Sequence, residues 1–491
     1  MQVTLGIDSL VLTGAALALA AVFASDAVTR RSRRFQVPGA LLFLALGMLF
    51  GDDGLGLISL DDPELVQNVG VIALLFILLE GGMTTKPTDL KLAALPGILL
   101  ATVGVVLTAG VTAAGAWLLL DIDIVTAALI GAVVGSTDAA AVFSMMRSTP
   151  LPRRAAALLR VESGSNDPIA VMLTIGLLAT YDQGATAGQW VGFALLQLLG
   201  GGAVGGLVGW FAVVLLRRTA MQIEGLYPIT VAAFGALAYG IAVTFGGSGF
   251  VAVYLTGVLI GALLPRERRA ILGFHEALAN AAEIGLFLLL GLLVFPSQLP
   301  AVAVAALLVA AVLTFIARPL AVWICTLGQD YGWRERTVLT LGGLKGAVPI
   351  VLATFPLTAG VEGADLVFNI VFFVVLVSVL IQGTALLPTV RSLGFIQPRP
   401  AWAPVAEAMP LEGIEVDLVE LHVTEEMPIA GRRLAELSIP DGSIVTAVIR
   451  TNHVTVPRGG TEILPGDVLL ITTQSDRDAL KKLTAWARGE G

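Results

Sequence analysis

Residues 162–168, Glu-Ser-Gly-Ser-Asn-Asp-Pro, place carboxylates, hydroxyl groups and an amide directly before an apolar run at residues 169–179. Ionisable side chains are costly inside a membrane, and those that occur there usually line the path of an ion or a proton. A second polar cluster, Ser136, Thr137 and Asp138, interrupts the preceding hydrophobic segment. Together the two clusters predict a protein that moves small cations and protons through a bilayer.

The composition up to about residue 395 is that of a protein embedded in a lipid bilayer. Hydrophobic residues make up 56% of the whole chain and charged residues only 13%, unlike an ordinary soluble domain. Apolar segments long enough to cross a bilayer recur, and about thirteen spans are expected. The net charge is −8 and the basic residues are scattered among short loops, so no nucleic-acid partner is expected. The single cysteine, Cys325, excludes disulfide frameworks and thiolate metal sites.

The loops between the apolar segments alternate in charge, which predicts the orientation of the chain. Arginine and lysine occur in every second loop, beginning with residues 30–34, whereas the loops between them are acidic or neutral. Because positively charged loops stay in the cytoplasm, the N-terminus is expected outside and, after an odd number of spans, the C-terminus inside. We therefore expect a multi-pass protein of the cell (inner) membrane whose C-terminal domain is cytoplasmic.

The composition changes after about residue 400. Three prolines within residues 397–404 indicate a stiff linker, which we place at 396–411. The following residues, 412–482, contain strand-like segments and a short amphipathic helix at 430–437. The strand-like segments are 415–421, 443–449 and 468–472. The pattern predicts a small α+β domain after the transmembrane domain, residues 1–395.

Two predicted spans, 123–146 and 335–357, combine helix-breaking residues with full charges. The first contains Asp138, and the second contains Lys345 among glycines. Irregular backbone is tolerated at membrane depth only where it lines a cavity or is buried in protein. The segments are spans five and twelve, and this odd offset predicts an inverted repeat in which two discontinuous helices cross. Asp138 is then expected to neutralise positive helix ends and Lys345 negative ones. The alternative is a pair of kinked packing helices.

The spacing within residues 162–168 separates two roles. Ser163 and Asp167 are four residues apart and share one helical face, whereas Glu162 lies about 140° around the helix from Asp167. Glu162 therefore needs its own partner, and Arg318 in the eleventh span is the expected one, forming a structural ion pair. Asp167 remains as the carboxylate for which a proton and a monovalent cation compete, and such competition is sufficient for exchange.

Other polar residues of the spans carry less information. Glu80 is either a ligand of the ion site or an interfacial residue, and Glu283 is expected to bond to unwound backbone. His275 and His422 are expected in loops or strands without ligand spacing around them. No Ser/His or metal-ligand constellation occurs in the spans, so we do not expect an enzyme. A gated potassium channel is a remote alternative, because the sequence has no Thr-Val-Gly-Tyr-Gly filter.

The motifs of residues 1–395 resemble, in order, those of the electroneutral branch of the monovalent cation:proton antiporters. That branch includes sodium/proton exchangers and potassium/proton antiporters. The resemblance rests on Thr137-Asp138, residues 162–167, Arg318-Pro319 and residues 343–347. It implies thirteen helices, a homodimer, and an elevator movement of a core domain against a dimerisation domain.

The resemblance also implies roles for individual residues. Asp167 is the transport carboxylate that takes the monovalent cation, with Ser163, Thr137 and Asp138 around the ion. Asn166 stands where the electrogenic branch has a second aspartate. One titratable carboxylate implies electroneutral exchange of one proton for one cation.

Four positions qualify this resemblance. A family counterpart of Glu80 approaches the ion in some members, which implies the same position for Glu80. Gly164 and Ser165 stand where exchangers often have two leucines, so the packing around them does not follow from the resemblance. Lys345 stands where many members have arginine, and the positive charge is kept.

The tail resembles the C-terminal lobe of regulators of potassium conductance, the TrkA-C type. Residues 428–434, 449–450 and 464–467 carry this resemblance. It implies pairing of the lobes and regulation of transport, with a nucleotide, a cation or no ligand at residues 412–482. The chain is thus expected to exchange potassium or sodium for protons without a cofactor. Potassium is favoured only because of the tail, and sodium/proton antiport for pH and salt homeostasis is the alternative.

Overall fold

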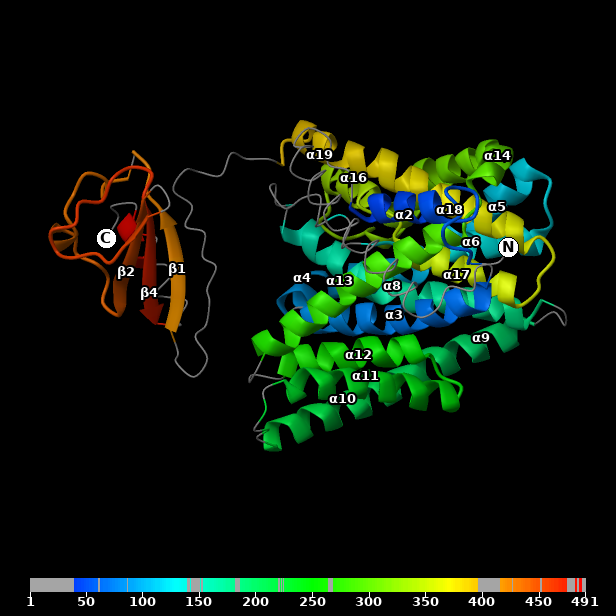
Figure 1. The fold of residues 1–491 in the computed structure, drawn as a ribbon, viewed down its shortest axis with the longest axis horizontal. Coiled ribbons are helices and arrows are strands. Elements are labelled where there is room, and N and C mark those ends of the chain that lie inside the picture. Colours follow the sequence, from blue (N-terminus) through cyan, green and yellow to red (C-terminus); the bar gives the residue numbers. More distant parts are fainter. Residues whose placement is uncertain are drawn as a thin grey trace. The chain divides into compact units, whose positions relative to one another are not determined.

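The chain folds into two compact units, Met1–Phe395 and Ile396–Gly491. The first is helical and the second contains a sheet (Figure 1). The computed structural model describes residues 39–60, 62–85, 87–138, 142, 151, 153–181, 186–219, 221, 223, 225–263, 268–395, 416–425, 427–450, 453–474, 482, 483 and 485–487. The expected first span, the basic loop at 30–34 and the linker at 396–411 lie outside the described residues.

The first unit is built from helices that run roughly along one direction (Figure 1). In chain order the α-helices are α2 (Gly39–Phe50), α3 (Pro63–Thr84), α4 (Pro87–Leu99), α5 (Val105–Leu120), α6 (Ile124–Val133), α8 (Arg153–Ala179), α9 (Ala187–Leu195), α10 (Gly201–Arg218), α11 (Leu226–Thr244), α12 (Gly249–Leu263), α13 (Arg268–Leu293), α14 (Leu299–Val312), α15 (Arg318–Cys325), α16 (Trp333–Leu341), α17 (Ala347–Thr358), α18 (Ala364–Val377) and α19 (Gly383–Ser392). A short 3₁₀ turn, η3 (Pro296–Gln298), precedes α14.

Seven segments of the described chain are helical, apolar and long enough to cross a bilayer. They are Pro63–Thr84, Leu92–Leu120, Gly188–Arg218, Leu226–Thr244, Ala270–Leu293, Pro296–Cys325 and Ala364–Ser392. Shorter apolar helices include Ile124–Val133 and Ala347–Thr358. Helix α8 is also 27 residues long, but its polar residues lower its hydropathy. The prediction of a helical domain with several membrane-spanning segments is confirmed.

Four of the long segments contain a π-helical turn. These turns are η1 (Leu100–Gly104), η2 (Leu196–Gly200), η4 (Leu313–Ala317) and η5 (Ser378–Gln382). Single π turns inside α-helices are frequent at functional sites because they shift the register of the side chains that follow. Turn η4 directly precedes Arg318, and η5 directly follows α18.

Two helical segments are interrupted where the sequence predicts irregular backbone. Helix α6 ends at Val133 and residues 134–138 are not helical, while α16 and α17 are separated by the non-helical residues 342–346. The two interruptions are in contact, because the backbone N–H of Asp138 donates to the carbonyl oxygen of Leu344 at 2.8 Å. Of the segment 139–150, the structure describes only Val142.

Helices α10, α11 and α12 lie side by side along one edge of the first unit, and α3 packs against α12 (Figure 1). The α3–α12 contact is close because glycines face backbone across it. A β-carbon on Gly257 would lie 2.5 Å from the carbonyl oxygen of Leu79. Gly82 and Gly261 make similar approaches to backbone of the opposite helix. No larger residue fits at these positions without moving the helices apart.

The second unit contains a four-stranded antiparallel sheet in the order β1-β4-β2-β3. The strands are β1 (Val416–His422), β2 (Ser443–Arg450), β3 (His453–Thr455) and β4 (Val468–Gln474). Leu421, Ile463, Ile471 and Trp486 contribute to its buried core. The small C-terminal sheet domain expected from the sequence is therefore confirmed.

An ion pair fixes one end of this sheet. Arg450 Nε donates to Asp467 Oδ1 at 2.7 Å, and the backbone N–H of Leu464 donates to Asp467 Oδ2 at 2.8 Å. The hydrogen bond from Arg450 is the main cause that lowers the pKa of Asp467 below its usual value, and the Leu464 N–H acts in the same direction. Asp467 belongs to the predicted turn at 464–467, in which Gly466 has a φ of +91°.

The prediction of an amphipathic helix at residues 430–437 is wrong. The structure has only a single 3₁₀ turn there, η6 (Leu434–Glu436). Gly431 adopts a φ of +77°, and its N–H donates to the carbonyl oxygen of Ile463 at 2.7 Å. Leu434 N–H donates in the same way to Thr461. The backbone of this segment therefore pairs with residues 459–463 instead of forming a helix.

Candidate functional site

A cavity of about 390 Å³ in the first unit gathers most of the polar residues that the sequence singles out. Its walls come from the end of α3, from α8 and α13, and from the two interruptions after α6 and before α17. The polar lining residues are Glu80, Thr84, Thr85, Ser136, Thr137, Asp138, Arg160, Ser163, Asp167 and Glu283. Predicted ligands from widely separated parts of the sequence thus face one space.

Asp167 lies in this lining with only 8% of its surface exposed. Its Oδ1 atom is buried and has no hydrogen-bond partner among the described residues. A buried carboxylate oxygen without a donor is costly, unless a proton or a cation neutralises it. Ser163, one helical turn earlier on α8, lines the same cavity. The arrangement can therefore bind a small cation or a proton at Asp167.

Asn166 does not line the cavity but is bonded to a residue that does. Its side-chain Nδ2 donates to Thr137 Oγ1 at 2.6 Å, and both side chains are buried. Thr137 lines the cavity, whereas Asn166 is not among the lining residues. The amide thus joins α8 to the interruption after α6 and holds Thr137 at the wall of the cavity.

Asp138 and Lys345 lie where the two interruptions meet. Lys345 is 2% exposed, and its Nζ donates to the carbonyl oxygen of Ser136 at 2.7 Å. The Asp138 side chain packs on Gly346, where an added β-carbon would lie 2.8 Å from its Cβ. Lys345 is thus bonded to a carbonyl just beyond α6, and Asp138 lies beside the N-cap of α17. Each charge is of the sign that stabilises the adjacent helix end.

Glu162 points away from the cavity and contacts Arg318. The guanidinium group donates to both carboxylate oxygens, with 2.9 Å between Nη2 and Oε2. Nη2 also donates to the carbonyl oxygen of Leu339 at 3.1 Å. Gly343 allows this approach, because a β-carbon there would lie 2.9 Å from Cζ of Arg318. The pair is almost fully buried and connects α8 to α15 and α16.

Three further charged residues line the cavity in addition to the main predicted ligands. Glu80, which the sequence predicts to be either a ligand of the ion site or an interfacial residue, lies in the cavity lining. Glu283, expected against unwound backbone, also lies in the lining, on α13. Arg160 is a lining residue that was not predicted from the sequence, although it lies seven residues before Asp167. Two full helical turns put those residues on one face, and that spacing could have indicated Arg160.

His275 was expected in a loop or a strand, and this expectation is wrong. It lies within α13 and is fully buried, and its Nδ1 is 2.8 Å from the carbonyl oxygen of Ile271. The contact with the preceding turn satisfies one ring nitrogen, whereas Nε2 is buried without a partner among the described residues. His422 ends strand β1, in line with the sequence.

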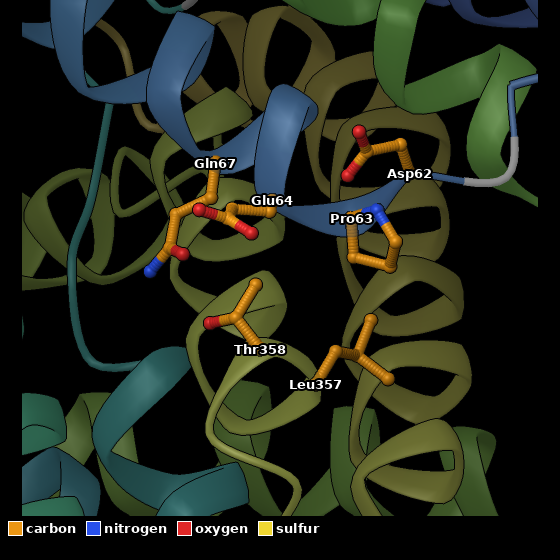
Figure 2. A pocket seen from close by; sticks show the side chains of 6 residues that line it. All are labelled: Asp62, Pro63, Glu64, Gln67, Leu357 and Thr358. Carbon is orange, nitrogen blue, oxygen red and sulfur yellow. The ribbon is translucent and has the colours of Figure 1, made fainter.

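A second hollow, of about 500 Å³, lies where the start of α3 faces the end of α17 (Figure 2). It is lined by Asp62, Pro63, Glu64, Gln67, Leu357 and Thr358. The Asp62 side chain accepts from the N–H of Leu65 at 3.0 Å and caps α3. Acidic residues at a helix N-terminus stabilise the helix, which accounts for Asp62 and Glu64 structurally.

Comparison with protein families gives two matches. Residues 17–392 match the model of the transmembrane sodium/hydrogen exchanger family. Residues 418–485 match the TrkA-C domain. Between them the two matches cover both units of the structure.

Several curated proteins are similar over most of the chain. The K(+)/H(+) antiporter NhaP2 of Shewanella sp. (strain ANA-3) is 39% identical over 492 residues, which covers 98% of this chain and 84% of the relative. The K(+)/H(+) antiporter NhaP of Alkalimonas amylolytica is 39% identical over 437 residues, or 87% and 75% of the two chains. The Na(+)/H(+) antiporter NhaS2 of Synechocystis sp. is 30% identical over 350 residues, or 69% and 64%.

Among solved structures, the fold is similar to that of the sodium proton antiporter MjNhaP1 from Methanocaldococcus jannaschii. The TM-score is 0.68 at 24% sequence identity, and the match covers 76% of this chain and 99% of the other. At this identity the likeness concerns the fold.

Proposed function

The chain belongs to the sodium/hydrogen exchanger family and is a monovalent cation/proton antiporter, and we propose that it exchanges one potassium ion for one proton at Asp167. Relatives named potassium/proton antiporters are 37–39% identical to it, against 30% for a relative named a sodium/proton antiporter. The TrkA-C domain also favours potassium. Sodium/proton exchange is the second candidate, because the fold matches a sodium proton antiporter.

The observation that carries this proposal is the buried carboxylate of Asp167 in the wall of a cavity rich in oxygen atoms, with an Oδ1 that has no partner among the described residues. A dehydrated alkali cation needs several oxygen ligands. We propose that the hydroxyl groups of Ser163 and Thr137 and the carboxylates of Asp138 and Glu80, which all line the cavity, supply them beside Asp167. A proton needs only the carboxylate. The cation and the proton therefore compete for the carboxylate of Asp167. If the site crossed the membrane with neither bound, an unneutralised charge would remain in a low-dielectric environment.

The proposed stoichiometry follows from the neutrality of Asn166. An amide at this position holds Thr137 without contributing a second charge to the site. Exchange of one proton for one cation at Asp167 then moves no net charge. The other lining carboxylates, Asp138, Glu80 and Glu283, must keep one protonation state through the cycle for this balance to hold.

The proposed architecture is an inverted repeat of thirteen spans in which two broken helices cross beside the site. The hydrogen bond from Asp138 to Leu344 and the bond from Lys345 to Ser136 support the crossing. Asp138 at the N-cap of α17 and Lys345 beyond the end of α6 would then neutralise opposite helix ends. The predicted orientation, with a cytoplasmic C-terminal domain in the inner membrane, completes this proposal.

The transport movement we propose is an elevator. The Glu162–Arg318 pair, the Asn166–Thr137 bond and the Lys345–Ser136 bond join the site helix to both interruptions as one group. Helix α3 is joined instead to α12 through their glycine contacts. The cavity lies between these two groups, so movement of one against the other would expose it to each side in turn. We propose that the second group carries the contact of a homodimer.

The experiment that tests this function is cation-driven proton movement in everted membrane vesicles. After acidification of the lumen, added potassium should release protons, and sodium should do so less effectively. Collapsing the membrane potential should leave the rate unchanged, because the exchange is electroneutral. Sodium-driven exchange without a response to potassium would favour the second candidate, and a rate that follows the potential would contradict the stoichiometry.

The C-terminal domain is proposed to regulate transport and not to catalyse it. Deletion of residues 405–491 is therefore expected to shift the pH profile of exchange while exchange itself continues. Asp467→Ala should give a similar shift in the full chain, because it removes the counter-charge of Arg450 and the acceptor of the Leu464 N–H. The measurement is the exchange rate across a pH series. A truncated protein that is inserted correctly but inactive would show that the domain is more than a regulator.

A further inference from the structure

Tyr254 of α12 contacts two of the walls of the cavity that contains Asp167. Its hydroxyl oxygen lies 3.3 Å from Oγ1 of Thr85, at the end of α3. Its ring packs on Gly164 of α8. Thr85 and Gly164 both line the cavity, and Tyr254 itself is 7% exposed. The side chain therefore lies between the helix that carries Glu80 and the helix that carries Asp167.

The contact with α3 is a directed hydrogen bond. Thr85 Oγ1 donates its proton to the carbonyl oxygen of Gly81 at 2.7 Å. The Tyr254 hydroxyl must then be the donor to Thr85. The tyrosine is thus attached to the last turn of α3, one turn beyond Glu80.

The contact with α8 depends on the absence of a side chain at Gly164. A β-carbon at this position would lie 2.8 Å from Cε2 and 2.9 Å from the hydroxyl oxygen of Tyr254. Gly164 directly follows Ser163 and precedes Asp167 by three residues. The position of the ring therefore limits how closely the ligand-bearing part of α8 approaches α12.

The backbone of Tyr254 is fixed relative to α3. Gly82 packs on the carbonyl oxygen of Tyr254, and Gly257 packs on that of Leu79. These contacts leave little freedom between α3 and α12. A change in the length of the Tyr254 side chain is therefore expected to displace α8 and not α3.

We propose that Tyr254 is a specificity-determining residue that holds the α8 and α3 walls at a separation suited to potassium. Alkali cations are distinguished by the number, field and spacing of the oxygen atoms that replace their water. A shorter side chain would let the walls approach and favour the smaller sodium ion, and a wider separation would favour larger ions. This inference rests on the proposed cation site at Asp167.

The test is the apparent KM for sodium, potassium and rubidium in everted vesicles that contain the full-length protein. Tyr254→Leu should lower the ratio of the sodium KM to the potassium KM by about tenfold, the scale expected when a pocket changes by a few carbon atoms. Tyr254→Phe keeps the ring and loses only the hydroxyl group, which bonds to Thr85 and lies beside Gly164, so a smaller shift in the same direction is expected. Gly164→Ala should move the preference the other way, towards rubidium.

Tyr239→Leu is the matched control. Tyr239 of α11 also packs on a glycine, Gly249, but Gly249, unlike Gly164, is not among the described residues that line the cavity. This variant should keep the wild-type ratio, and thermal melting of each purified protein identifies variants that are not folded. Unchanged KM ratios in folded Tyr254→Phe and Gly164→Ala proteins would overturn the inference while wild-type exchange left the proposed function intact. A wild-type protein without alkali cation exchange would instead refute the proposed function itself.

Discussion

Asp167→Asn is expected to lose cation-driven proton movement, by about a hundredfold or more, because it removes the one group that takes both substrates. Asparagine keeps the shape of the side chain but neither releases a proton nor offers a negative charge to a cation. The native Oδ1 is buried without a partner among the described residues, so replacing the carboxylate relieves an unfavourable burial. The variant should therefore melt at a temperature no lower than that of the wild type.

The measurement is proton release from acidified everted vesicles after addition of potassium and, separately, of sodium. Ser165→Ala is a suitable control, because Ser165 lies on the same helix but is not among the described lining residues of the cavity. Its exchange should equal that of the wild type. Exchange that persists in a folded Asp167→Asn protein would mean that another lining carboxylate, such as Asp138, carries the proton.

The division of roles within residues 162–168 could be predicted from the sequence. A rotation of about 100° per residue puts Ser163 and Asp167 on one face and Glu162 on another. The structure has Ser163 and Asp167 in the cavity lining and Glu162 bonded to Arg318. Helical periodicity was sufficient because α8 is a regular helix over these residues.

The far wall of the cavity could not be predicted in the same way. Glu80 and Glu283 lie on α3 and α13, and their common position depends on how those helices pack around α8. The sequence does not indicate a role for Tyr254, because single tyrosines are common in apolar helices. Its importance follows from the absence of a side chain at Gly164, a contact between residues 90 positions apart.

Two predictions from local sequence patterns were wrong because the backbone makes hydrogen bonds that those patterns do not show. Residues 430–437 have the spacing of an amphipathic helix, but Gly431 turns the chain and its N–H bonds to Ile463. His275 is predicted in a loop or a strand, yet it lies in a helix and its Nδ1 contacts the carbonyl oxygen of the preceding helical turn. In both cases a backbone partner that the sequence does not show decided the outcome.

Glu162→Gln is expected to lower the stability of the folded protein by about 3–5 kcal/mol, because it leaves a buried guanidinium group without its counter-charge. Arg318 can retain hydrogen bonds to the Leu339 carbonyl and to the new amide oxygen, but neither carries a negative charge. Gly343 lies against the guanidinium group and leaves it no route to solvent on that side. The measurement is the thermal melting temperature and the amount of folded protein in the membrane.

The matched control is Glu362→Gln, which removes the same charge from an exposed position and should leave melting unchanged. Because Glu162 is not among the described residues that line the cavity, the folded fraction of Glu162→Gln should exchange cations with the wild-type KM. That combination separates a structural ion pair from a ligand: stability falls while affinity stays. Normal melting of Glu162→Gln together with an altered cation KM would instead place Glu162 in the transport site and leave Arg318 to be neutralised by another group.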